Sequence, residues 1–80
     1  MSKPLTNNAI IYAILALNSE IGLQKEYLDS GEIAENEKAN ENGILDDLEQ
    51  ALMEFIDLYK IRISADQSLP SLDELLNHPL

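Results

Sequence analysis

The 80-residue sequence contains no cysteine and only one histidine, His78. The lack of cysteine excludes disulfides, thiolate metal ligands and thiol nucleophiles together. His78 lies between Asn77 and Pro79, and a histidine in a chain tail is far more often incidental than catalytic. Glycine-rich phosphate loops and spaced pairs of histidine and carboxylate are also missing, so the usual nucleophile–base arrangements cannot form. We therefore expect no enzyme activity, no catalytic residue and no cofactor.

Positive charge is scarce as well. Five lysines and arginines stand against fifteen acids, which gives a net charge of −10. The imbalance lies in residues 26–57, where eleven acids are accompanied by Lys38 alone. Such a field repels nucleic acid and anionic membranes and favours basic protein partners, although acidic side chains also simply keep small helical proteins in solution. We expect the acidic surface to include Glu35, Glu37, Glu41, Asp46, Asp47 and Glu49.

Long apolar runs are absent too. The run at residues 9–17 is far shorter than the roughly twenty residues that cross a bilayer as a helix. Met1 to Pro4 leads into polar residues and does not read as a typical signal peptide. We expect a cytoplasmic protein that has neither a membrane nor a nucleic acid as its partner.

The longest periodic stretch is residues 44–63, in which apolar residues recur in steps of three and four. This spacing lines one face of a helix. Ala51, Leu58 and Ile61 make the apolar stripe wider than a two-stranded coiled coil needs, so the helix requires more than one packing partner. The stripe itself comprises Ile44, Leu45, Leu48, Leu52, Phe55, Ile56, Tyr59 and Ile63.

Two long helices are expected, over residues 8–29 and 35–63, after an arm at residues 1–7. Asn7 or Asn8 can cap the first helix, and Gly31 in the turn at residues 30–34 can take the left-handed conformation that ends many helices. An alternative breaks the second helix at Asn42-Gly43 and makes residues 30–43 a loop. We prefer the continuous helix, because a loop of that length is unusual in so small a domain.

Gly22 and Gly43 fall at nearly the same level of the two helices. Facing each other, they would let the two backbones approach closely. Alternatively, Gly43 merely weakens its helix and Gly22 faces solvent.

The tail predicts a linker at residues 64–70 and a short helix at residues 71–77. Ser71 followed by Glu74 is a capping box, and the helix carries Leu72, Leu75 and Leu76 on one face. Such a helix is too short to be stable alone, so it must dock on its own chain, on a neighbouring subunit or on a partner. We prefer docking on its own chain, although the leucines also fit the pattern by which short helices enter grooves of other proteins.

Acid pairs such as Asp46 with Glu49 could hold a hard cation only weakly, so a solvated acidic face is the simpler interpretation and no metal site is expected. The chain is expected to be one all-α domain, residues 1–80. Its two long helices form an antiparallel hairpin that dimerises into a four-helix bundle with a second copy. Candidates for burial between subunits are Ile11, Leu15, Leu48, Leu52, Phe55, Ile56 and Tyr59.

The function expected from these features is a non-enzymatic, homodimeric protein–protein interaction module, such as an adaptor, a chaperone-like protein or an inhibitor subunit. The alternative is an acidic mimic that occupies a basic, nucleic-acid-binding surface of a target protein. Groove binding should survive raised salt, whereas mimicry should weaken steeply.

Overall fold

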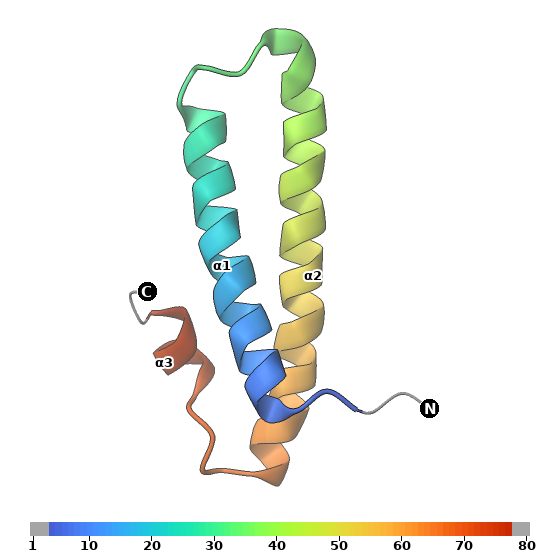
Figure 1. Cartoon of the computed structure of the whole chain (residues 1–80), viewed down its shortest axis with the longest axis vertical. Coiled ribbons are helices and arrows are strands. Elements are labelled where there is room, and N and C mark those ends of the chain that lie inside the picture. Colours follow the sequence, from blue (N-terminus) through green and yellow to red (C-terminus); the bar gives the residue numbers. More distant parts are fainter. Residues whose placement is uncertain (1–3, 78–80) are drawn as a thin grey trace.

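All regular elements of the chain are helices in the computed structural model, which describes residues 4–77. Two long helices, α1 (Asn7–Asp29) and α2 (Lys38–Ala65), are followed by the short helix α3 (Leu72–Leu76). Figure 1 shows α1 and α2 lying along each other, with the turn that joins them at the top and α3 beside α1. The expected all-helical class, with two long helices and a short C-terminal one, is confirmed.

The first helix begins at Asn7 because Thr6 caps it, not Asn7 or Asn8. Thr6 has an extended backbone, and its Oγ1 accepts a hydrogen bond from the N–H of Ala9 at 3.1 Å. Asn7 has a different partner, since its Oδ1 accepts a hydrogen bond from Nη1 of Arg62 at 2.8 Å. This bond joins the start of α1 to the end of α2.

The turn between the long helices uses Gly31 as expected, with a φ of 78°. The preceding Ser30 donates its hydroxyl to the carbonyl of Tyr27 at 2.7 Å and accepts from the N–H of Glu32 at 3.2 Å. Ile33 is buried. The turn is therefore held by local hydrogen bonds and one apolar side chain.

The second long helix is continuous through Asn42 and Gly43, so the alternative with a break there is wrong. A single 3-10 turn, η1 (Glu35–Glu37), leads into it, and no side chain caps that turn at Ala34. The closely packed glycine pair is also wrong. A Cβ atom added at Gly22 or at Gly43 would meet no other atom within 4 Å.

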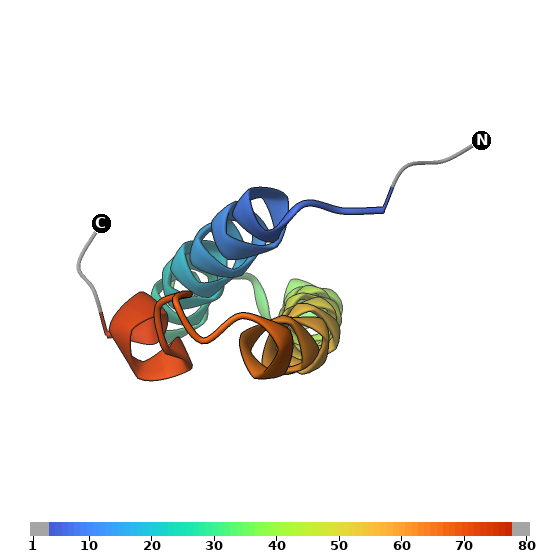
Figure 2. The same ribbon diagram turned by 90° about the horizontal axis from the view of Figure 1, so that it is seen from below.

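The core lies where all three helices meet. Ile10 and Ile14 of α1, Tyr59 of α2 and Leu75 of α3 form one buried cluster. Figure 2, a view from below, shows α3 and the C-terminal part of α2 on the same side of α1. A short helix can be stable there because Ser71 Oγ accepts from the N–H of Glu74 at 3.2 Å and Leu75 leaves water.

Candidate interaction surface

The tail occupies one side of the long helices. Leu75 is buried against the core, and Leu72 and Leu76 pack partly buried beside it. Two hydrogen bonds reach across: Asn18 Nδ2 donates to the carbonyl of Leu76 at 3.5 Å, and Tyr59 Oη donates to the carbonyl of Pro70 at 2.6 Å. The short helix thus docks on its own chain, and its leucines are engaged there.

This docking changes the set of residues that a second molecule could cover. Tyr59 has no exposed surface left in the single chain, so we leave it out of the surface that a second molecule could cover. Ile11 and Leu15 are half-buried and pack against the cluster that contains Leu75. Leu48, Leu52, Phe55 and Ile56 of α2 are half-buried as well.

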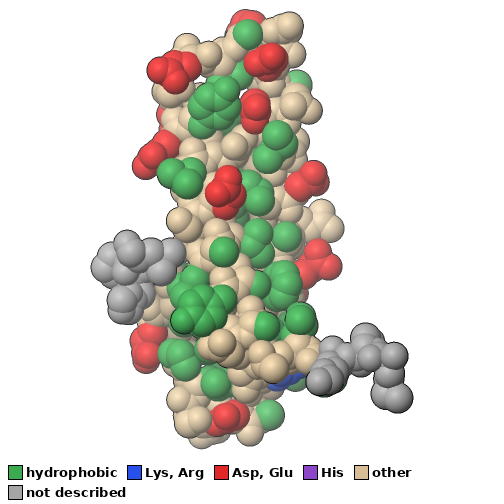
Figure 3. Space-filling view, viewed as in Figure 1, with side chains coloured by type: hydrophobic (Ala, Val, Ile, Leu, Met, Phe, Trp, Pro, Cys, Tyr) green, Lys and Arg blue, Asp and Glu red, His purple; other side chains and the backbone are tan. Residues whose placement is uncertain are grey.

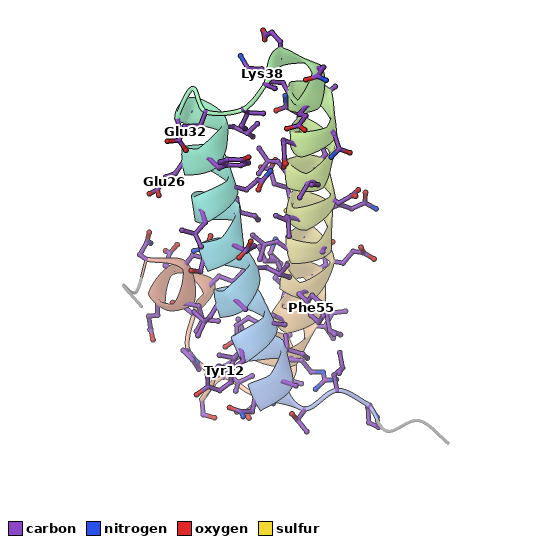
Figure 4. The ribbon with its side chains drawn as sticks, turned by 45° about the horizontal axis from the view of Figure 1, so that its top comes forward. Tyr12, Glu26, Glu32, Lys38 and Phe55 are labelled. Atoms are coloured by element: carbon purple, nitrogen blue, oxygen red, sulfur yellow. The ribbon has the colours of Figure 1, made fainter. Side chains whose placement is uncertain are left out.

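A second apolar surface, here called the front face, is left open by the other helices within residues 4–77. It is the face turned to the viewer in Figure 3, where hydrophobic side chains gather over α1 and α2 along their length. Several of these side chains are well exposed, among them Tyr12 at 64% and Leu23 at 57%. Figure 4 labels Tyr12 on α1 and Phe55 on α2. We define the front face as Tyr12, Ala16, Leu23 and Tyr27 of α1 with Ile44, Ala51, Phe55 and Leu58 of α2; Phe55 and Leu58 are half-buried and also pack against the core.

Helical spacing explains this surface. Ala16, Leu23 and Tyr27 lie seven and four residues apart, which places them along one side of α1. The sequence pattern did not single out this row, because the main apolar stripe of α1 runs through Ile10, Ile14 and Ile21. The sequence nevertheless contains a sign of this surface. A helix that packs against one partner normally carries a single apolar stripe, and α1 carries two.

An open pocket lies within the front face, on α2. Ala51, Phe55 and Leu58 supply apolar walls and Glu54 a carboxylate, around a volume of about 220 Å³. These residues are spaced by one, three and four positions, so they follow one side of the helix. The pocket therefore combines an aromatic ring, aliphatic carbon and one negative charge.

Acids surround the apolar part of the front face. Glu20 lies in the α1 row between Ala16 and Leu23, and Asp47 lies four residues before Ala51 on α2. Figure 3 shows acidic side chains around and between the hydrophobic ones, with blue only in one small area near the lower end. The surface is thus apolar, with acidic side chains both around and between its apolar ones (Figure 3).

The acidic residues named from the sequence do not form one equivalent set. Glu35, Glu37, Asp46, Asp47 and Glu49 are exposed, and Glu35 forms an ion pair of 3.2 Å with Lys38. Glu41 differs, because Gln24 Nε2 donates both to its carboxylate at 2.9 Å and to its backbone carbonyl at 3.0 Å. Glu41 therefore links α2 to α1 and is a structural residue.

Two side chains near the tail have shifted pKa values. Burial, with a smaller contribution from the charge of Glu74, raises the pKa of Tyr59. The hydroxyl and the N–H of Ser68 both donate to Asp66 Oδ1, at 2.6 and 3.1 Å, and lower the pKa of that carboxyl. Both residues belong to contacts that hold the linker.

Residues 4–77 provide neither a metal site nor a membrane span. No three histidine, cysteine, aspartate or glutamate side chains come together there in a way that could hold a metal ion. None of the described helices has the length and apolar character needed to cross a membrane. His78 lies outside the described residues.

Comparison of the chain with protein-family models, with curated proteins and with solved structures gives no significant match.

Proposed function

We propose that this chain is a non-enzymatic protein–protein interaction module that acts through its helical faces, with the front face as its binding surface. The observation that supports this most is the exposure of the front face, with large apolar side chains such as Tyr12 and Leu23 in water. Extended exposed apolar surface that is rimmed by polar groups is typical of binding sites. The tail adds to the argument, because its helix α3 lies behind α1 and not over the front face (Figure 2).

Self-association is part of the proposal. Two antiparallel hairpins of α1 and α2 that meet through their front faces would form a homodimeric four-helix bundle. An isologous pair would also bring the acids of one front face near those of the other, so the dimer should become stronger as salt screens them.

The test is the molar mass by light scattering on a sizing column, at micromolar protein in low and high salt. We expect a mass near twice 8.9 kDa, at least in high salt. Leu23→Ser should weaken the association, because it removes apolar area from the front face. The matched control is Met53→Ser, which is 54% exposed on α2 and lies outside the front face. A monomer under all conditions would exclude the four-helix bundle.

The acidic mimic is supported by a different observation, the exposure of Glu35, Glu37 and their acidic neighbours. Charge reversal at Glu35 and Glu37 should abolish binding by mimicry and leave binding at the front face intact. Glu41 should not be included in such a variant, because its bonds with Gln24 hold the helices together. Raised salt also separates mimicry from self-association through the front face, since mimicry depends on exposed charge alone and should weaken.

A further inference from the structure

We infer that the preferred occupant of the front face is a cationic amphipathic helix of another protein. This inference rests on the proposed function, since it names the class of partner that the same surface would bind. It goes further by assigning the recognition to particular residues, above all to the pocket at Glu54. Three features carry it: the shape of the face, the chemistry of the pocket and the distribution of charge.

The shape fits a helix. The front face follows two long helices side by side, and apolar residues run along both of them. An amphipathic helix laid between two helices buries its own residues at steps of three and four, as in other helix-in-groove complexes. On α1 the face runs from Tyr12 to Tyr27, a length of about four helical turns of a partner.

The pocket fits a lysine or an arginine of that helix. Its apolar walls, Phe55 and Leu58, can cover the alkyl part of such a side chain, while the carboxylate of Glu54 meets the charge. The ring of Phe55 is a further favourable neighbour for a cation. A purely apolar side chain would leave Glu54 without a partner at the edge of a dry contact, which is unfavourable.

Charge decides between a cationic helix and a second copy of the chain. Along the two rows, Glu20, Asp47 and Glu54 are acidic, and no lysine or arginine lies between residues 12 and 23 or between 44 and 58. Arg62, which lies four residues after Leu58 on α2, donates to Asn7. A second copy would present the same acids, whereas a cationic helix would complement them. The cationic helix should therefore displace the homodimer at low salt.

The test uses the full chain and two synthetic peptides. Both peptides are fluorescently labelled amphipathic helices with leucines at steps of three and four. One has lysine and the other glutamate at the remaining positions. Binding is measured by fluorescence anisotropy at two salt concentrations, with the unmodified chain, with Glu54→Lys and with Glu49→Lys. Glu49 is the matched control, because it is an exposed glutamate of the same helix that lies outside the pocket.

We expect the lysine peptide to bind and the glutamate peptide not to bind. Glu54→Lys should weaken binding by about tenfold, and Glu49→Lys by less than about threefold, because only the first charge meets the peptide at close range. Leu23→Ser should weaken it as well, by about tenfold, with Met53→Ser as its control. Equal losses in the two charge variants would overturn the inference, since binding would then follow overall charge.

The remaining outcomes separate this inference from the proposed function. If the lysine peptide fails to bind while the chain is a dimer that Leu23→Ser disrupts, the front face binds a second copy. In that case the inference is wrong and the proposed function stands. If neither peptide binds and the chain is monomeric at every salt concentration, both are wrong.

Discussion

The hydroxyl of Tyr59 donates a hydrogen bond to the carbonyl oxygen of Pro70 over 2.6 Å. The ring of Tyr59 is fully buried in the core, next to Ile10, Ile14 and Leu75. One side chain of α2 therefore fills the core and holds the linker that brings α3 back to the long helices. Because α3 is only five residues long, its position depends on such tertiary contacts and not on helix propensity.

Replacing Tyr59 with phenylalanine should destabilise the protein by about 1 kcal/mol. The ring would still fill the core, but the partly buried carbonyl of Pro70 would lose its donor. The measurement is the free energy of unfolding in urea. Tyr12→Phe is the control, because Tyr12 is 64% exposed and its loss of a hydroxyl should change that free energy by less than about 0.5 kcal/mol. Equal effects of both substitutions would show that the Tyr59 hydroxyl contributes nothing specific.

The raised pKa of Tyr59 predicts that the protein loses stability at alkaline pH. Burial, and to a lesser degree the charge of Glu74, raises the pKa of Tyr59 above its ordinary value of 10.0. Above pH 10 the unfolded chain therefore loses this proton before the folded chain does, so stability falls as the pH rises further. The free energy of unfolding should decrease less between pH 9 and pH 11 in Tyr59→Phe than in the unmodified chain. An equal decrease in both proteins would contradict this assignment.

The helices could be predicted from the sequence because apolar spacing, Gly31 and the Ser71 cap are local signals. Partners of individual side chains could not be predicted in this way. Tyr59 lies on the apolar stripe of its helix, but its hydroxyl bonds with a residue eleven positions later, beyond the end of that helix. Glu41 looks like one acid among many, and only the position of Gln24 on the other helix makes it structural. Periodicity shows that a side chain is buried, but not which element buries it.

The role of the exposed residues of the front face could not be predicted from periodicity either. Leu23 and Tyr27 lie off the main stripe of α1, so a hairpin pattern alone assigns them no role. They become informative when α3 is seen to pack on another side of α1, because both side chains then stay exposed among the residues that the structure describes.

The linker after α2 offers a test by NMR. Asp66 ends α2, and its Oδ1 accepts hydrogen bonds from the hydroxyl and the N–H of Ser68. These bonds favour the charged carboxylate and lower the pKa of Asp66, and the hydroxyl makes the larger contribution. In Ser68→Ala the titration midpoint of the Asp66 carboxyl carbon should therefore move upward.

The control for this shift is Ser64→Ala, because Ser64 donates to the carbonyl of Lys60 and does not bond with Asp66. A lowered pKa stabilises the folded state above the ordinary value of 3.8, and that contribution disappears as the pH falls through the native pKa. Ser68→Ala should therefore be less stable than the unmodified chain at pH 6 and approach it below pH 3. A midpoint for Asp66 that stays in place in Ser68→Ala would contradict the role of the hydroxyl.

Replacing the three glycines by alanine should change the stability in opposite directions, depending on the position. Gly22 and Gly43 lie inside helices without positive φ, and a Cβ atom at either position meets nothing within 4 Å. Alanine at each position should therefore raise the free energy of unfolding, by about 0.5–1 kcal/mol, because it reduces the freedom of the unfolded chain. Gly31→Ala should lower it by about 1–2 kcal/mol, since its φ of 78° is unfavourable for a residue with a Cβ atom.

Urea unfolding of the three variants at one low protein concentration measures these changes within the single chain. The double variant of Gly22 and Gly43 should gain about the sum of the two single gains, because neither added methyl group touches another residue. A loss of stability in Gly43→Ala would mean that another backbone approaches this helix closely. If that loss appeared only at high protein concentration, the approaching backbone would belong to a second copy, and the homodimer would then have to pack α2 through Gly43.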